Sequence, residues 1–241
     1  EKVFSTCDEF LDLDGNNNAN NDDTDGIATF DFSVATNEIK DFFPALIRPN
    51  LAVYFYESIP DRTASVNNIN SEIANHRNNN DPTFATNQTI YARIINTVNN
   101  DCTGTAQLFL KVDTVPLANN LAQPLSFCDD FDSGASDDGE NININLRQTV
   151  NEILGPTQTE TDFIVTYHNS QADASSGTAP ILNDTNFRNT APAGFVAGTI
   201  SRQTIYVRVE DRNKVPACFN DHLSFDIEIK PLPGLQNTIA A

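Results

Sequence analysis

The chain has 241 residues, 33 of them acidic and 14 basic, which gives a formal net charge of −19. Such a surface repels nucleic acid backbones and anionic membranes, so we expect neither nucleic acid binding nor direct membrane insertion. It suits cations, above all calcium, whose preferred ligands are carboxylate and amide oxygens. The length suits one large domain or two of ordinary size, and we interpret a chain that opens at Glu1 as a mature or excised fragment.

An internal repeat organises the chain. A Cys-Asp opening, an Asp-Gly pair, a Gln-Thr-Ile-Tyr strand and a later cysteine each occur twice in the same order. The paired positions are Cys7 with Cys128, Asp25 with Asp138, Gln88 with Gln203, and Cys102 with Cys218. This duplication predicts one domain at 1–117 and another at 124–232, joined by a linker at 118–123, with the start of a linker to a further repeat at 233–241.

The local pattern within each copy is that of β-strands. Apolar residues alternate with polar ones at 30–34 and 142–146, at 88–94 and 203–209, and in the last strands at 108–112 and 225–229. One short helical turn per copy is predicted, at 39–43 and at 150–154. Short strands in units of about a hundred residues predict an all-β fold of two tandem immunoglobulin-like β-sandwich domains.

The second copy carries the most specific family resemblance. Its segments VTYHNSQADASSGTAPI (165–181) and QTIYVRVE (203–210) resemble repeats of very large Bacteroidetes surface proteins, including gliding-motility adhesins exported by the type IX secretion system. The first copy keeps the Cys-Asp opening, DGIATFDF (25–32) and the strand at 88–94, but lacks a counterpart to 172–174. The resemblance implies extracellular display at the cell surface, and a role in adhesion or as a structural stalk.

Four cysteines without C-x-x-C spacing favour disulfides over zinc or redox motifs. Sequence alone allows three connectivities. The pairings that respect the repeat are Cys7–Cys102 and Cys128–Cys218, and these are the ones we predict.

The acidic loop after each opening cysteine is the candidate metal site. Calcium needs six to eight oxygens, which a short flexible loop can bring together. Asp12-x-Asp14-Gly15 resembles the start of a calcium loop, although no glutamate follows at the final EF-hand position; the alternative is a solvated acidic turn. The predicted calcium ligands are Asp8, Asp12, Asp14, Asp25, Asp129, Asp132 and Asp138.

No nucleophile elbow, phosphate loop or paired histidine ligands are present, so we expect no enzyme activity. The predicted function is a structural or adhesive repeat of a long cell-surface adhesin, stiffened by disulfides and calcium, whose first partners are neighbouring repeats of the same polypeptide. Surface glycans or other adhesive ligands are further candidate partners. Two alternatives stay open: a carbohydrate-binding β-sandwich of a secreted protein, and a subunit of a self-assembling extracellular filament.

Overall fold

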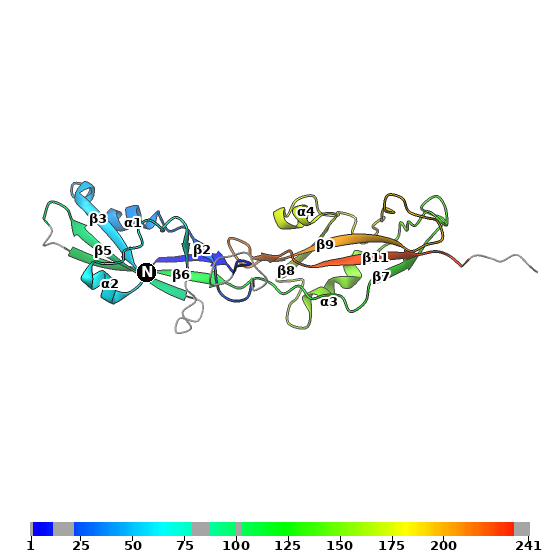
Figure 1. The fold of residues 1–241 in the computed structure, drawn as a ribbon, viewed down its shortest axis with the longest axis horizontal. Helices are drawn as coiled ribbons and strands as arrows, with labels where there is room; N and C mark the ends of the chain where they lie inside the picture. Colours follow the sequence, from blue (N-terminus) through cyan, green and yellow to red (C-terminus); the bar gives the residue numbers. More distant parts are fainter. Residues whose placement is uncertain (1, 12–21, 79–86, 100–102, 234–241) are drawn as a thin grey trace, which may run out of the picture. The chain divides into compact units, whose positions relative to one another are not determined.

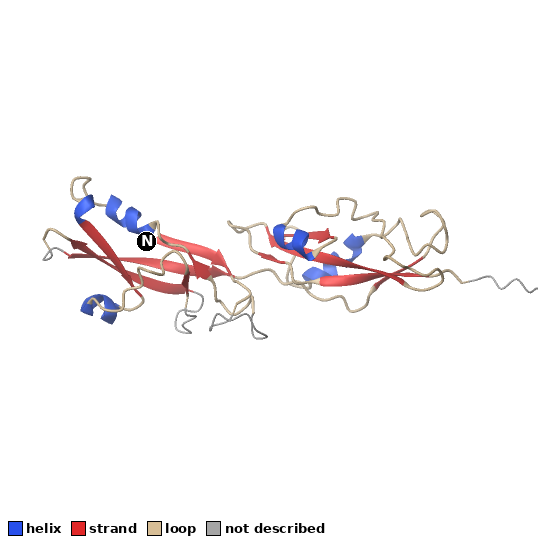
Figure 2. Cartoon of the chain, turned by 45° about the horizontal axis from the view of Figure 1, so that its top comes forward, coloured by secondary structure: helices blue, strands red, loops and turns tan. Residues whose placement is uncertain are grey.

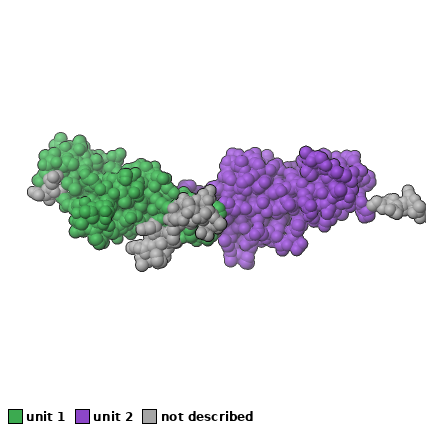
Figure 3. Space-filling model, viewed as in Figure 1, with its two compact units in different colours: residues 1–115 green, residues 116–241 purple. Residues whose placement is uncertain are grey.

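The computed structural model describes residues 2–11, 22–78, 87–99 and 103–233. The chain divides into two compact units, 1–115 and 116–241, which are coloured separately in Figure 3. The segment 118–123, predicted as a linker, therefore lies within the second unit.

A four-stranded sheet forms the centre of the first unit (Figure 1). Its order is β1 (Lys2–Cys7), β6 (Thr103–Asp113), β5 (Asn87–Asn96) and β3 (Leu51–Tyr56). β1 runs parallel to β6, whereas the other neighbours are antiparallel. The short strands β2 (Thr29–Phe30) and β4 (His76–Arg77) form a second ladder. The helices are α1 (Ala35–Asp41), the 3-10 helix η1 (Arg48–Asn50) and α2 (Ile59–Ala64).

The second unit repeats this topology. Its strands are β7 (Leu125–Cys128), β8 (Phe163–His168), β9 (Ser201–Asp211), β10 (Phe219–Asn220) and β11 (Ser224–Lys230). β7 runs parallel to β11, and β9 pairs antiparallel with β8, β10 and β11. Its helices are the 3-10 helix η2 (Leu146–Thr149), α3 (Val150–Leu154) and α4 (Gln171–Ser176). β10 and β11 together thus occupy the place that β6 has in the first unit.

Strand periodicity places the two hydrophobic cores. Ile90, Ala92 and Ile94 of β5 are buried, and their neighbours on the other face of the strand are only partly covered. The strand predicted at 203–209, which is part of β9, shows the same alternation of buried and partly covered side chains. Each unit has its own core of buried apolar side chains. The prediction of two tandem all-β, immunoglobulin-like domains is confirmed, and Figure 2 shows strands as the dominant element of both units.

Two predicted strands are shorter than expected. β2 ends at Phe30, and the 142–146 stretch makes only one bridge, from Ile144 to Phe187, before η2 begins. Polar side chains explain the interruption, because they bond the backbone two residues further on in place of a neighbouring strand. Asp31 Oδ1 accepts from the Ser33 amide at 2.9 Å, and Asn145 Oδ1 accepts from the Arg147 amide at 3.1 Å.

Each unit also contains a second helix that the apolar pattern did not predict. Ser58 caps α2 by accepting from the Asp61 amide at 3.1 Å, and Ser170 caps α4 through the Asp173 amide at the same distance. A serine at the N-cap satisfies an otherwise unpaired amide of the first turn. The helix at 171–176 therefore has a counterpart in the first copy, and the expectation that 172–174 lacks one is wrong.

Candidate functional site

The acidic turn of the first unit is held from two sides. Asp8 follows β1, and its Oδ2 accepts from the Gly26 amide at 2.9 Å. Asn78, which follows β4, donates from Nδ2 to the Gly26 carbonyl at 2.8 Å and accepts at Oδ1 from the Ala28 amide at 2.7 Å. Both side chains are buried. Gly26 has a φ of +79°, a conformation that other residues adopt at a cost.

The second unit repeats this arrangement bond for bond. Asp129 Oδ2 accepts from the Gly139 amide at 2.8 Å. Asn189 donates to the Gly139 carbonyl at 3.0 Å and accepts from the Asn141 amide at 2.7 Å. We call this arrangement the clamped turn: Asp8, Gly26 and Asn78 in the first unit, and Asp129, Gly139 and Asn189 in the second. Because both copies keep it while the loops between its members differ in length, the clamped turn is a structural constant of the repeat.

Each clamped turn buries a carboxylate oxygen without a hydrogen-bond partner. Asp8 and Asp129 are 6% and 3% exposed, and Oδ1 of each has no partner among the described residues. Burial raises the pKa of Asp8 to about 6; the Gly26 amide opposes this shift, and the negative charge of Asp25 adds to it. Burial likewise raises the pKa of Asp129, with Asp138 adding to the shift. An unpaired buried charge is costly, so each site favours a proton or a cation.

The structure brings together only part of the predicted calcium set. Asp8 lies close enough to Asp25 for their charges to interact, and Asp129 does so with Asp138. Asp132 is exposed. Asp12 and Asp14 lie outside the described residues. Among the residues that the structure describes, no group of three His, Cys, Asp or Glu side chains could hold a metal ion.

The cysteines are in different states. Cys7 and Cys218 are both disulfide-bonded. Cys128 is free and exposed, so the predicted Cys128–Cys218 bridge does not form in the structure. Cys102, the predicted partner of Cys7, lies outside the described residues.

Strand direction explains why Cys128 and Cys218 do not meet. Cys218 accepts from the amide of Asp211, at the C-terminal end of β9. Cys128 pairs with Lys230 of β11. The residue of β11 just before Lys230 pairs with Ser201, which lies at the other end of β9. Ten residue steps of about 3.3 Å separate these ends by roughly 33 Å, whereas bridged cysteines have Cα atoms within about 7 Å.

Two copies of one family model match the chain, at residues 4–116 and 124–233. The chain belongs to the Flavobacterium inter-domain disulphide bond domain family. Membership fits the predicted resemblance to Bacteroidetes surface proteins. A flavobacterial disulfide domain, together with bonded cysteines, suggests an extracellular protein. The two domains and their disulfide suggest a structural role between domains.

Solved structures show only distant similarity to this pair of domains. The first two repeats of human mucin-like protocadherin match with 14% identity and a TM-score of 0.26, over 77% of this chain and 85% of that one. A SusE-like surface-located polysaccharide-binding protein of Bacteroides thetaiotaomicron matches with 12% identity and a TM-score of 0.23, over 75% of this chain and 29% of that one. No curated protein matches. Within the described residues, no helix is long and apolar enough to cross a membrane.

Sequence reasoning missed the two asparagines of the clamped turn. A signal exists, because Arg77-Asn78 and Arg188-Asn189 each follow an aromatic ring, His76 or Phe187. Both segments pair with the strand-like stretch that follows the Asp-Gly pair. Asparagine is common in this chain, so a match of two residues such as Arg-Asn does not by itself identify a site. The match becomes informative only once the topology shows that both asparagines lie beside the Asp-Gly pair.

Proposed function

We propose that this chain is a structural repeat pair of a long extracellular surface protein, in which a disulfide between consecutive domains limits their relative motion. The observation that carries the proposal is the bonded state of Cys7 and Cys218, which belong to different copies of the family domain. The proposed role is mechanical and non-enzymatic.

The proposed bridge joins Cys7 to Cys218. A cysteine forms one disulfide, the chain has four cysteines, and Cys128 is free. Cys102 could therefore bond only one of the two bonded cysteines, which would leave the other without a partner. Pairing Cys7 with Cys218 satisfies both.

The position of each cysteine within its own unit supports this pairing. Cys7 lies beside Asp113, at the end of β6 from which the chain leaves the first unit. Cys218 lies just before β10. The strand β11 continues the same edge of the sheet and runs in the same direction as β7. Cys218 is therefore near the end at which the chain enters the second unit. The bridge would close a loop of about 210 residues, for which the chain-entropy model gives about 5 kcal/mol of stabilisation.

Thiol counting with matched variants tests the bridge. Cys218→Ser should expose one additional thiol, because Cys7 loses its partner, whereas Cys128→Ser should remove one. Peptide mapping without reductant should recover the Cys7 and Cys218 peptides joined. Recovery of a Cys7–Cys102 or Cys128–Cys218 peptide would overturn the proposal.

The same pairing between consecutive domains would give Cys128 a role. It occupies in β7 the position of Cys7 in β1, at the end of the unit from which the chain leaves. We propose that it pairs with a cysteine of the Cys218 type in another repeat, so that successive domains are linked in series.

The wider proposal is an adhesin of the cell surface, exported by the type IX secretion system and acting in gliding or attachment. It is supported by the resemblance of 165–181 and 203–210 to such repeats and by family membership. Antibodies against this chain should label intact cells, and labelling should be lost when type IX secretion is disabled. Equal labelling in both strains would exclude this export route.

Calcium is proposed as the ion that neutralises the clamped turns. The support is the unpartnered, buried Oδ1 of Asp8 and Asp129, each beside a second carboxylate. The proposed ligands are Asp8 and Asp25 in the first unit, and Asp129 and Asp138 in the second. Backbone carbonyls and water would complete the oxygen set that calcium requires.

A further inference from the structure

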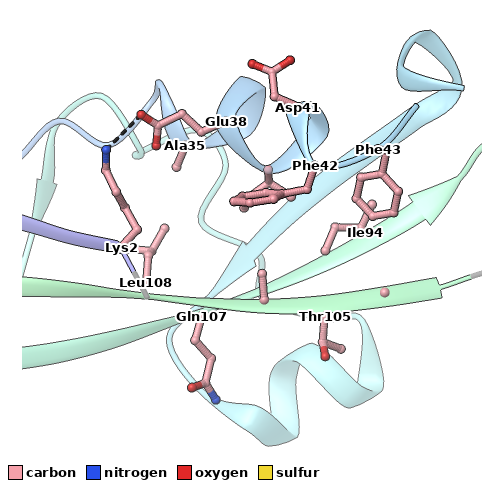
Figure 4. Close-up of a pocket in the computed structure, with 13 residues that line it drawn as sticks. Lys2, Ala35, Glu38, Asp41, Phe42, Phe43, Ile94, Thr105, Gln107 and Leu108 are labelled. Carbon is pink, nitrogen blue, oxygen red and sulfur yellow. Dashed lines mark hydrogen bonds and ion pairs between the residues drawn. The ribbon is translucent and has the colours of Figure 1, made fainter. Parts of the chain in front are cut away.

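The first unit has a groove between helix α1 and its central sheet. The groove encloses about 670 Å³, and Lys2, Ile39, Phe42, Phe43, Ile94 and Leu108 are among the residues that line it (Figure 4). Phe42 is 89% exposed, although it belongs to the apolar side of this helical segment. Exposure of a whole phenylalanine ring leaves apolar area in water that folding normally buries.

The same surface is covered in the second unit. The amide of Phe32 donates to the Ile73 carbonyl, and the amide of Leu146 donates to the Asp184 carbonyl at the same place in the second unit, so this register matches Ile39 with Ile153. Ile153, on α3, is fully buried, whereas Ile39, on α1, is only partly buried. The equivalent positions thus differ in exposure, because a segment of the chain covers α3 in the second unit and none of the described residues covers α1 in the first.

The cover in the second unit is the segment 117–122, which precedes β7. Ala118 and Leu121 pack against the core of the second unit. Asn119 donates both its backbone amide and its side-chain Nδ2 to the carbonyl of Ile153, each at 2.9 Å. The Ala122 amide donates to the carboxylate of Glu152. Polar and apolar contacts together fix this segment on α3.

One glycine makes room for the cover. A Cβ atom at Gly155, directly after α3, would stand 2.8 Å from Asn119 Nδ2. That is too close for an unaltered contact, so the absence of a side chain at Gly155 leaves room for the Asn119 side chain in its present position.

Topology specifies what would cover the groove of the first unit. The covering segment of the second unit leads directly into β7, and β1 is the equivalent strand. Lys2, at the start of β1, lines the groove, and its Nζ lies 2.9 Å from Glu38 of α1. Chain that enters β1 therefore arrives at the edge of the groove. Residues 114–127 carry no charge, which suits an apolar groove that has acidic residues at its rim.

We propose that the α1 groove of the first unit is a docking site for an inter-repeat segment of the Leu117–Ala122 kind, entering from the N-terminal side of β1. The occupant is an extended, uncharged stretch with two leucines and a central asparagine. Docking would bury Ile39 as Ile153 is buried and would shield the neighbouring Phe42, so that each repeat is completed by the connection that precedes it.

The test extends the whole chain at its N-terminus with the sequence of residues 115–121, which places the copied segment in register with β1. The control extension has the same length and composition in scrambled order. The chain contains no tryptophan, so Phe42→Trp supplies a single fluorescent reporter. With the copied segment, we expect a blue-shifted emission and at least a twofold drop in acrylamide quenching, together with a higher melting temperature; the control should change none of these.

Three results would overturn the proposal. Equal quenching with the copied and scrambled extensions would show that the groove does not recognise the segment. A blue shift in the unextended chain that grows with protein concentration would assign the groove to a second copy. A reporter already shielded in the dilute unextended chain would show that no open groove exists. Because the unmodified chain with each extension is also melted, a folding defect of Phe42→Trp cannot conceal the answer.

Discussion

Replacing Asp8 by asparagine separates the two consequences of its burial. The carboxyl group has its pKa raised from 3.8 to about 6, mainly by desolvation. The unfolded chain therefore releases this proton at lower pH than the folded chain does. The stability that Asp8 contributes is full below pH 3.8 and is lost as pH rises through about 6. At 1.36 kcal/mol per pKa unit, the loss is at most about 3 kcal/mol, and water around the turn reduces it.

Asp8→Asn keeps an oxygen for the Gly26 amide but carries no charge. Without calcium at pH 7.5, we expect the variant to be as stable as the wild type or more stable, and to lose the stability change between pH 4 and pH 7 that is due to Asp8. With calcium at a hundredfold excess over its dissociation constant, each calcium site of the wild type should add about 2.7 kcal/mol by mass action. Asp8→Asn should lose most of the gain that belongs to the first unit.

Urea unfolding at pH 4, 5.5 and 7.5, with 5 mM calcium or excess chelator, measures both effects. Asp132→Asn is the matched control, because Asp132 is an exposed member of the acidic stretch of the second unit. An Asp8→Asn variant with the wild-type pH dependence would refute the buried-charge argument. A variant that retains the full calcium response would refute a calcium site at Asp8 while leaving the clamp intact.

Three further predictions each concern the replacement of one side chain. Asn189→Ala leaves the Asn141 amide and the Gly139 carbonyl of a buried turn without partners, so it should cost about 2–3 kcal/mol in urea unfolding, whereas exposed Asn183→Ala should cost under about 0.5. Burial lowers the pKa of His168 below 6.5; stability should therefore fall as pH drops below 6.5, a slope that His168→Gln removes and His222→Gln keeps. Asn119→Ala deletes one bond to the Ile153 carbonyl and should cost about 1 kcal/mol, with Asn120→Ala as its control.

The period-two pattern was enough to predict the long strands of the sheets. Ile90, Ala92 and Ile94 are buried as predicted, because a strand with one covered face must alternate. The second helices were also within reach, since Ser58-x-x-Asp61 and Ser170-x-x-Asp173 are capping signals that need no tertiary information. The shortened strands at 30–34 and 142–146 depend on competition between side chains and neighbouring strands, which alternation alone does not reveal.

The cysteine pairing could not be read from the repeat alone. Equal positions in two copies predict equal bonds, but they do not say whether a bond closes within a copy or between copies. The deciding fact is the direction of the first and last strands. Antiparallel pairing of β7 with β11 would bring the end of one to the start of the other, and so Cys128 towards Cys218. The observed parallel pairing separates them instead.

The same parallel pairing bears on the proposed mechanical role. In each unit the first strand and the last strand run in one direction, so the chain enters at one end of the domain and leaves at the other. The sheet itself is long in this direction, because the 11 residues of β6 span about 33 Å in ten steps of roughly 3.3 Å. An antiparallel pair would return the chain to the end where it entered. A domain that the chain enters at one end and leaves at the other is suited to serial linkage. In such a chain, pulling on the ends loads the hydrogen bonds between β1 and β6 together, because the force runs along both strands.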